Sequence, residues 1–433
     1  MVSARRFATV ASSTAHAKVA IIGCGSAGIS VASQLLNSAP ELSKYGQVVL
    51  IDPASKHHYQ PLFTLVGAGL KTMDQATRTM GSVVPKAARW LQSRVDGVDA
   101  VANIVHLADG TSLSYEALVI APGIRPDYKA IEGLSETIGK NNVCTNYDPK
   151  HVASTFDFMR TFKGGKAIFT QPASPIKCGG APQKIMYLFE DYLCRTAKDI
   201  RANTDISFFS GLGKLFAIPK YDMALAGVCA NREINVNLLH ELVAVDGPAK
   251  QAVFKVLGEN GSKEVVVPFD FLHVSPPLSP PAFIKASGLT DGITPYVAVD
   301  KHTTQHMHHS NIFSLGDASS LPTSKTAAAI ASESAVTTRN LLSFLSGQPI
   351  SARYEGYTSC PLVTGKGKLI LAEFNAYTSE VQESFHFDQA KESLLMYHLK
   401  ADILDKMYWH GMLKGLWTGP SKVRGITNPF DRN

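Results

Sequence analysis

The sequence predicts an α/β protein built on twisted parallel sheets, and three observations lead to this class. An apolar run at Lys18–Gly23 has the length of a buried strand, and it passes through a glycine-rich turn into an apolar-periodic helix that reaches Leu36. A second apolar strand is predicted at residues 47–52. Buried strands that alternate with helices are typical of parallel sheets covered on both faces. At 433 residues, the chain has room for roughly two to three domains.

The turn after the first strand reads Gly-Cys-Gly-Ser-Ala-Gly from Gly23 to Gly28, which is a GxGxxG pattern between a strand and a helix. Gly23 permits the tight turn, Gly25 lets the backbone approach a pyrophosphate, and Gly28 allows the helix to pack closely on the strand. The helix N-terminus at Ser26 and Ala27 supplies N–H groups and the positive end of the helix dipole to the anion. This segment is therefore predicted to bind a dinucleotide.

Three later features favour FAD as that dinucleotide. Asp52 ends the second strand 24 residues after the last glycine of the turn, where its carboxylate can accept a hydrogen bond from a ribose hydroxyl. Two further apolar strands end in Pro122-Gly123 and in Gly316-Asp317. Both endings resemble the secondary signatures of glutathione-reductase-like flavoproteins with two dinucleotide-binding domains, in which the aspartate bonds the ribitol. We therefore expect bound FAD.

A helix is predicted to begin just after Asp317, in the segment that contains Lys325 and Thr326. In flavoproteins of this fold, the N-terminus of that helix points at the pyrimidine edge of the flavin. Its dipole would stabilise an anionic reduced ring by roughly 1 kcal/mol. Lys325 would add positive charge, and we expect both Lys325 and Thr326 to contact FAD.

The strand predicted at residues 166–170 begins a second Rossmann-like domain, but no glycine turn follows it. Two prolines stand there instead, and proline lacks the N–H donor that a phosphate needs. Cys178 lies just ahead of a predicted helix, with Lys177 beside it and Lys184 one turn into the helix. These neighbours favour a thiolate, whereas most free cysteines are buried and structural. The position alone leaves both interpretations open.

Cys360 is the candidate partner of Cys178, because it too precedes a proline and is flanked by small polar residues. Nothing in the spacing determines whether two cysteines so far apart in sequence meet. No Cys or His spacing resembles a zinc site, and the histidines at 302–309 stand in a polar stretch before a strand, so we predict no metal. We expect the remaining cysteines to be unreactive thiols: Cys24, Cys144, Cys194 and Cys229.

Charge and hydropathy limit the function classes further. The 42 basic and 36 acidic residues give a net charge of +6 that is spread along the chain, so no nucleic-acid-binding footprint is predicted. No apolar run reaches the roughly 18 residues of a transmembrane helix. Residues 1–17 contain Arg5 and Arg6 and no acid, which is typical of a mitochondrial presequence; a disordered tail is the alternative.

Residues 391–417 repeat apolar and aromatic side chains at roughly helical spacing, with lysines between them. This pattern is typical of an amphipathic helix that lies in a membrane surface. The alternative is a pair of helices that pack on the core or on a second subunit.

Four strings carry a specific resemblance to a known family: SPIKCGGAPQK at 174–184, YTSCPLVT at 357–364, HYQP at 58–61 and LPTSKTAA at 321–328. From about residue 18 to residue 420, the chain resembles the mitochondrial sulfide:quinone oxidoreductases of animals and fungi. The resemblance implies that Cys178 and Cys360 form the redox pair. It also places four residues among the FAD contacts: Gln60, Val95, Asp317 and Lys325. Lys184 is a candidate to hold the incoming anion, and an exposed helix lysine is the alternative.

The activity that the resemblance implies is oxidation of hydrogen sulfide through the cysteine pair and FAD, with reduction of ubiquinone. Sulfane sulfur would pass to a small acceptor such as glutathione, sulfite or cyanide. The implied location is the surface of the mitochondrial inner membrane, and a homo-oligomer is compatible with it. Phe374, Phe385 and Phe387 are candidates to line a quinone pocket, although single aromatics are more often core residues.

Two other functions stay open at this point. A type II NADH:quinone oxidoreductase has the same fold, but the missing second glycine turn disfavours it. A flavin-bound scaffold with purely structural cysteines is the other alternative. The expected division of the chain is a presequence (1–17), an FAD domain (18–125 and 290–345), a second Rossmann-like domain (126–289) and a C-terminal region with amphipathic helices (346–433).

Overall fold

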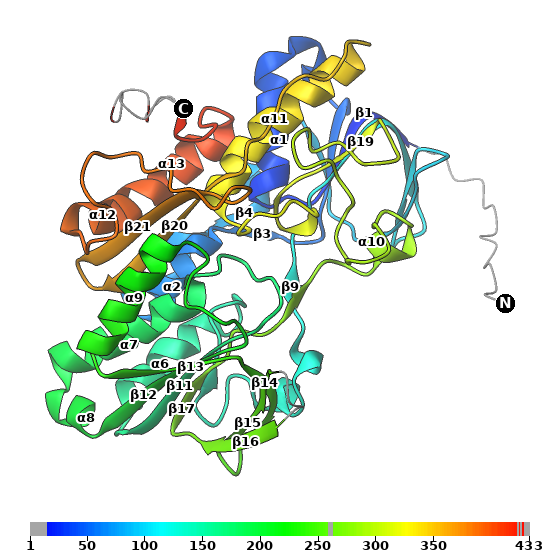
Figure 1. The fold of residues 1–433 in the computed structure, drawn as a ribbon. Helices are drawn as coiled ribbons and strands as arrows, with labels where there is room; N and C mark the ends of the chain where they lie inside the picture. The colour runs from blue at the N-terminus through cyan, green and yellow to red at the C-terminus, as the bar shows by residue number, and fades with distance from the viewer. Residues whose placement is uncertain (1–14, 259–262, 422–423, 425–426, 428–433) are drawn as a thin grey trace.

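The computed structural model describes residues 15–258, 263–421, 424 and 427 (Figure 1). The predicted presequence up to residue 14 and nearly all of the polar tail at 421–433 lie outside this range. The first strand, β1 (Ala15–Ile22), begins three residues before the predicted start at Lys18. Ala15 and Ala17 pair in register with Leu113 and Tyr115. The boundary that we predicted at residue 17 is therefore wrong, because these residues extend the central strand.

The first sheet has a parallel core, with an antiparallel pair of strands, β6 and β7, added to β8. The helices α1 (Ser26–Ser38) and α11 (Ala327–Leu345) lie side by side over this sheet (Figure 1). The strands are β5 (Arg89–Leu91), β2 (Val48–Ile51), β1, β8 (Ser112–Ile120), β19 (Ile312–Ser314), β7 (Ile104–Leu107) and β6 (Val95–Asp99). The predicted α/β class with parallel sheets is thereby confirmed.

The second sheet is parallel throughout, in the order β10-β17-β11-β12-β13. A small antiparallel sheet, β14-β15-β16, lies beside it. The chain passes between the two domains through a short pair of strands, β9 (Arg125–Pro126) and β18 (Leu278–Ser279) (Figure 1). The strands are β10 (Val143–Cys144), β17 (Phe271–His273), β11 (Gly165–Gln171), β12 (Thr204–Ser210), β13 (Ile234–Leu238), β14 (His240–Asp246), β15 (Gln251–Val256) and β16 (Lys263–Pro268). The helices of this domain are α5 (Leu134–Thr137), α6 (Val152–Thr161), α7 (Ala181–Thr196), α8 (Lys198–Ala202) and α9 (Pro219–Asn231).

The C-terminal region adds a hairpin, β20 (Tyr357–Gly365) and β21 (Lys368–Asn375). β20 packs on both α7 and α11, so it bridges the two domains. After the hairpin come four helical pieces: α12 (Leu394–His398), a π turn η5 (Leu399–Ile403), α13 (Leu404–His410) and a 3-10 turn η6 (Met412–Lys414). No helix in the described part of the chain has both the length and the apolar character to cross a membrane.

Short elements complete the fold between the strands of the first domain. β3 (Lys56–His58) pairs with β4 (Thr77–Thr79) beneath the C-terminal helices. The short helices are α2 (Phe63–Gly67), α3 (Met73–Ala76), α4 (Met80–Val83) and α10 (Phe283–Ala286).

Candidate active site

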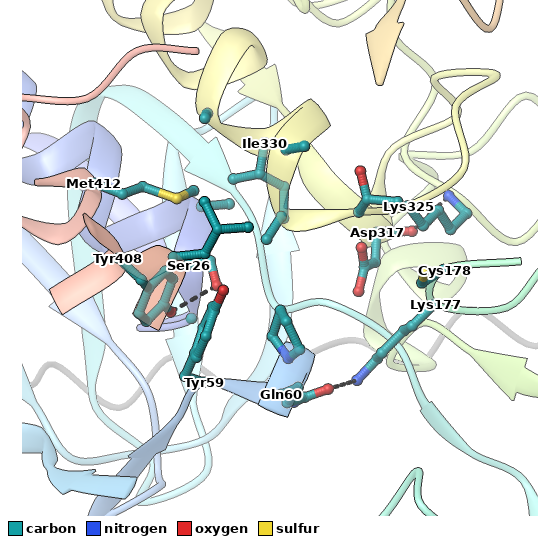
Figure 2. A pocket seen from close by; sticks show the side chains of 18 of the residues that line it. Ser26, Tyr59, Gln60, Lys177, Cys178, Asp317, Lys325, Ile330, Tyr408 and Met412 are labelled. Carbon is teal, nitrogen blue, oxygen red and sulfur yellow. Dashed lines mark hydrogen bonds between the residues drawn. The ribbon is translucent and has the colours of Figure 1, made fainter. Parts of the chain in front are cut away.

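A cavity of about 640 Å³ extends from the glycine turn of the first domain to Cys178 at the edge of the second (Figure 2). Its walls come from segments that are far apart in the chain. They are the turn after β1, the end of β8, the start of α11, the segment before α7 and the C-terminal helical pieces. A cavity of this size is in the range of a cofactor site.

The glycine turn has the geometry that its sequence predicts. Gly23 has φ +99°, and a Cβ there would lie 2.3 Å from the carbonyl oxygen of Ala121. A Cβ on Gly28 would lie 1.9 Å from the carbonyl oxygen of Gly23, so α1 can approach β1 only without a side chain at that position. Gly25 lines the cavity, and a Cβ there would meet nothing within 4 Å. The open space over Gly25 is therefore the place for a bound group.

We expect alanine substitutions at the two glycines to separate folding from cofactor binding. Gly28→Ala forces α1 away from β1 and should destabilise the protein by roughly 3 kcal/mol, because the clash is with backbone. Gly25→Ala should leave the melting temperature of the cofactor-free protein unchanged and weaken FAD binding, since the methyl group points into the cavity. Thermal unfolding and FAD titration test the pair. Equal losses of stability would contradict this assignment.

Asp52 follows β2 and lines the cavity. Its two carboxylate oxygens accept backbone N–H bonds from Cys24 (2.8 Å) and Ala54 (2.8 Å). The carboxylate thus fixes the far side of the glycine turn, and each oxygen retains a lone pair for a ligand hydroxyl.

The opposite end of the cavity is built by buried charges. The Lys325 ammonium donates to the carbonyl oxygens of Asp317 (2.8 Å) and Ser319 (3.1 Å). Burial raises the pKa of the Asp317 carboxyl, and the charge of Lys177 opposes that shift. Lys177 in turn donates to the side-chain oxygen of Gln60 at 3.0 Å (Figure 2). Lysines therefore face this end of the cavity from two elements.

The predicted FAD contacts fall into three groups. Most line the cavity: Gly25, Ser26, Ala27, Asp52, Gln60, Pro122, Gly123, Asp317, Lys325 and Thr326. Thr326 also caps α11 by accepting the N–H of Ala329. Three glycines lie behind the wall: Gly23 and Gly316 have positive φ in turns, and Gly28 lets α1 pack closely on β1. Val95 lies in β6, and its side chain is buried in the apolar core of the first domain, outside the cavity lining.

The structure brings Cys178 and Cys360 together, with their sulfur atoms 2.9 Å apart. This exceeds the bonded S–S distance of about 2.05 Å. Cys360 comes from the middle of β20, whereas Cys178 lies just before α7, so the packing of β20 on α7 sets the contact. The Lys184 ammonium donates to the sulfur of Cys178 at 3.2 Å. Cys178 lines the cavity, whereas Cys360 is almost fully buried behind it.

Cys178, Cys360 and Lys184 shift one another's pKa values. The hydrogen bond from Cys360 and the charge of Lys184 hold the pKa of Cys178 well below its usual value, although burial opposes this. The hydrogen bond to Cys178 and burial raise the pKa of Cys360. Burial would lower the pKa of Lys184, but the two sulfurs outweigh it and raise that pKa. Lys184 is only 6% exposed, so the alternative of a solvent-exposed helix lysine is wrong.

The other cysteines differ from this pair. Burial raises the pKa of Cys24, Cys144 and Cys229. Cys194 is exposed, and its thiol donates to Glu190 at 2.9 Å. Among the described residues, no group of three or more His, Cys, Asp or Glu side chains is arranged to hold a metal ion.

Lys400 is a site residue that sequence reasoning missed. It lies in the π turn η5, is 4% exposed and lines the cavity. Its ammonium donates to the carbonyl oxygen of Pro61 at 2.9 Å and lies 5.5 Å from the ring centroid of Tyr59. Burial, together with the charge of Lys184, lowers the pKa of Lys400 to about 7. The only sequence signal was a lysine within an apolar helical stretch.

The C-terminal helical pieces pack on the core, as one interpretation of their sequence expected, and they also have exposed apolar side chains. One face packs on the core or lines the cavity, through residues such as Met396, Tyr408 and Met412. Four apolar side chains of these pieces are exposed, Leu394, Leu395, Ile403 and Leu416, among exposed polar residues such as Lys406 and Lys414. Of the three phenylalanines considered for a quinone pocket, Phe374 is a core residue, Phe385 lines the cavity and Phe387 is exposed.

The glycine turn and the two domains that flank the cavity are those of a flavin-dependent oxidoreductase. The family described as "Pyridine nucleotide-disulphide oxidoreductase" matches residues 17–154.

The relatives narrow this class. The mouse mitochondrial sulfide:quinone oxidoreductase is 41% identical to this chain, over 95% of this chain and 89% of the relative. The Schizosaccharomyces pombe protein of the same name is 40% identical, over 96% and 93%. The chain belongs to the family of mitochondrial sulfide:quinone oxidoreductases. The fold also matches the crystal structure of the sulfide:quinone oxidoreductase of Aquifex aeolicus, with a TM-score of 0.79, 17% identity and coverage of 96% of both chains.

Proposed function

We propose that this protein oxidises hydrogen sulfide by means of Cys178, Cys360 and a bound FAD, and that it delivers the electrons to ubiquinone. One observation carries this proposal: two cysteine sulfurs 2.9 Å apart lie beside a buried lysine at the wall of a cavity that begins at a dinucleotide-binding turn. The names of the relatives support sulfide and a quinone as the substrates.

The residues around the cavity fit FAD. Gly25 leaves open space for a pyrophosphate, and the N-terminus of α1 faces that space. Asp52 would bind the ribose, Asp317 the ribitol, and Lys325 with the N-terminus of α11 the pyrimidine edge of the ring. When bound, FAD would accept two electrons from the sulfur pair and release them to the quinone.

The sulfur chemistry follows thiol–disulfide exchange. In the oxidised pair, Cys178 and Cys360 are bridged by a disulfide or by one extra sulfur. For the disulfide, hydrosulfide attacks the sulfur of Cys360, an S–S bond forms there, and the Cys178–Cys360 bond breaks. The products are a persulfide on Cys360 and a thiolate on Cys178. A small acceptor such as glutathione, sulfite or cyanide then takes the outer sulfur from Cys360. When the two cysteine thiolates form their bond again, the pair loses two electrons, which bound FAD would accept.

The assignment of the leaving thiolate to Cys178 rests on its surroundings. Cys178 has the lowered pKa and the contact with Lys184, so it is the better leaving group. It also lines the cavity, which places the electron donor next to the proposed flavin. Cys360 lies behind it and is almost fully buried. Lys184 and Lys400 would attract the incoming anion.

The quinone and membrane assignments rest on the C-terminal region. Its exposed face of leucines and Ile403 suits insertion into a lipid surface, and Phe385 and Leu404 bring apolar groups to the cavity where a quinone could enter. We assign the protein to the mitochondrial inner membrane as a surface-bound enzyme. We also propose that the FAD domain comprises the chain from the start of β1 to residue 125 together with 290–345, and that 126–289 form the second domain.

An anaerobic absorbance spectrum of the purified protein tests this function. Sulfide should bleach the flavin absorbance or produce a long-wavelength charge-transfer band, and a short-chain quinone should restore the oxidised spectrum. NADH should have no effect, because a segment that contains prolines follows β11 in place of the glycine turn that would bind the NADH pyrophosphate. Reduction by NADH but not by sulfide would assign the protein to the NADH:quinone oxidoreductases. A spectrum that neither donor changes would mean that the cysteines are structural.

A further inference from the structure

Tyr408 connects the C-terminal helices to the dinucleotide-binding turn. It lies on α13, and its hydroxyl is 2.7 Å from the hydroxyl of Ser26 (Figure 2). The same hydroxyl is 2.6 Å from Nε2 of His57. The other ring nitrogen of His57 is 2.8 Å from the carbonyl oxygen of Cys24. Three hydrogen bonds, together with the backbone from Cys24 to Ser26, thus close a ring over the part of the turn that would face a pyrophosphate.

The direction of each bond in this ring follows from chemistry. The Cys24 carbonyl can only accept, so Nδ1 of His57 carries a proton and donates to it. Burial lowers the pKa of His57 to about 4, so near pH 7 the ring is neutral and Nε2 is an acceptor. The Tyr408 hydroxyl therefore donates a hydrogen bond to Nε2 of His57 and accepts one from the Ser26 hydroxyl. Consequently the Ser26 hydroxyl is not a free donor, and the anion must be held by the backbone N–H groups of α1.

The remainder of the C-terminal segment lies along α1. The Ser33 hydroxyl donates to the carbonyl oxygen of Leu413 at 2.7 Å, and the Asn37 amide donates to that of Lys414 at 2.8 Å. The ring of Tyr408 stacks on Tyr59, with centroids 4.2 Å apart. Met412, Trp417 and Tyr408 all line the cavity over the turn. A dinucleotide in this cavity would therefore lie against the segment.

We propose that Tyr408 is a positioning residue that locks the dinucleotide-binding turn, so that the C-terminal segment retains the cofactor as a latch. This proposal rests on the proposed binding of FAD. It goes beyond that function because it assigns a second role to the segment whose exposed face is proposed to enter the membrane.

The test is the rate of FAD release from the purified holoprotein. The protein is diluted, and the rise in fluorescence of free flavin is followed with time. Tyr408→Phe keeps the ring and its stacking but removes two hydrogen bonds, so release should be about tenfold faster. The matched control is Tyr397→Phe, a buried tyrosine on α12 of the same segment that does not line the cavity. It should release FAD at the parent rate.

A double-variant cycle distinguishes the lock from a general loss of packing. His57→Phe should also accelerate release, and the double variant with Tyr408→Phe should be no faster than the faster single variant, because both changes open the same ring. Additive effects, or parent-like release from Tyr408→Phe, would overturn the proposal. If Tyr408→Phe does not fold, parent-like release from His57→Phe overturns it equally. A parent protein that binds no flavin would refute the proposed function instead.

Discussion

Replacing Cys178 by serine is expected to slow the reduction of the flavin by sulfide at least a thousandfold, and replacing Cys360 should do the same. In either variant the S–S bond that hydrosulfide attacks cannot form. The cavity lined by the glycine turn and α11 is unchanged, so FAD should remain bound. Anaerobic stopped-flow absorbance measures the rate, and the flavin content of the purified protein measures retention of the cofactor.

Cys194→Ser is the matched control, because Cys194 is an exposed thiol on the same helix as Lys184, at its far end. It should reduce its flavin with sulfide at the parent rate. If either Cys178→Ser or Cys360→Ser retained full activity, the redox pair proposed here would be wrong even though the two sulfurs are in contact. If both variants lost FAD, the cysteines would instead support the structure of the site.

The elements that local sequence dictates could be predicted well. The strand before Gly23 is marked by an apolar run. The helix that begins at Ser26 is marked by the glycines of the turn, because only glycine fits the backbone geometry at Gly23 and the close packing at Gly28. The start of β1 was misplaced because Ala15 and Ala17 owe their strand conformation to pairing with β8, about a hundred residues later. Alanine is a weak strand former, so no local pattern marked those residues.

The site was predictable only as far as motifs and family resemblance reached. The contact of Cys178 with Cys360 depends on β20 packing against α7, which spacing along the chain does not encode. Lys400 and Tyr408 were missed for a related reason. A lysine or tyrosine in an amphipathic helix looks like a surface residue until the face on which the helix packs is known. The π turn at Leu399–Ile403 shifts the helical periodicity at that point.

Replacing Lys184 by methionine is expected to slow sulfide-driven flavin reduction roughly a hundredfold at pH 7 and to shift its pH profile toward alkaline pH. The ammonium lies 3.2 Å from the Cys178 sulfur, and at that distance a unit charge contributes several kcal/mol even at an effective dielectric constant of about 20. The parent pKa of Cys178 is lowered, so its thiolate is present well below the usual thiol range. Without Lys184 that pKa rises, the thiolate becomes a poorer leaving group, and activity should recover only as the pH increases.

Lys198→Met provides the control, since Lys198 is an exposed lysine at the start of α8, and its profile should match that of the parent. The profile of the Lys184 variant separates two roles for the ammonium. If Lys184 only attracted hydrosulfide, its loss would raise the sulfide concentration needed for half-maximal reduction and leave the limiting rate and its pH dependence unchanged. If it stabilises the thiolate, the limiting rate falls and the rising, acidic limb of its pH profile moves to higher pH. The contact of the ammonium with Cys178 at 3.2 Å favours the second outcome, and an unshifted limb would contradict it.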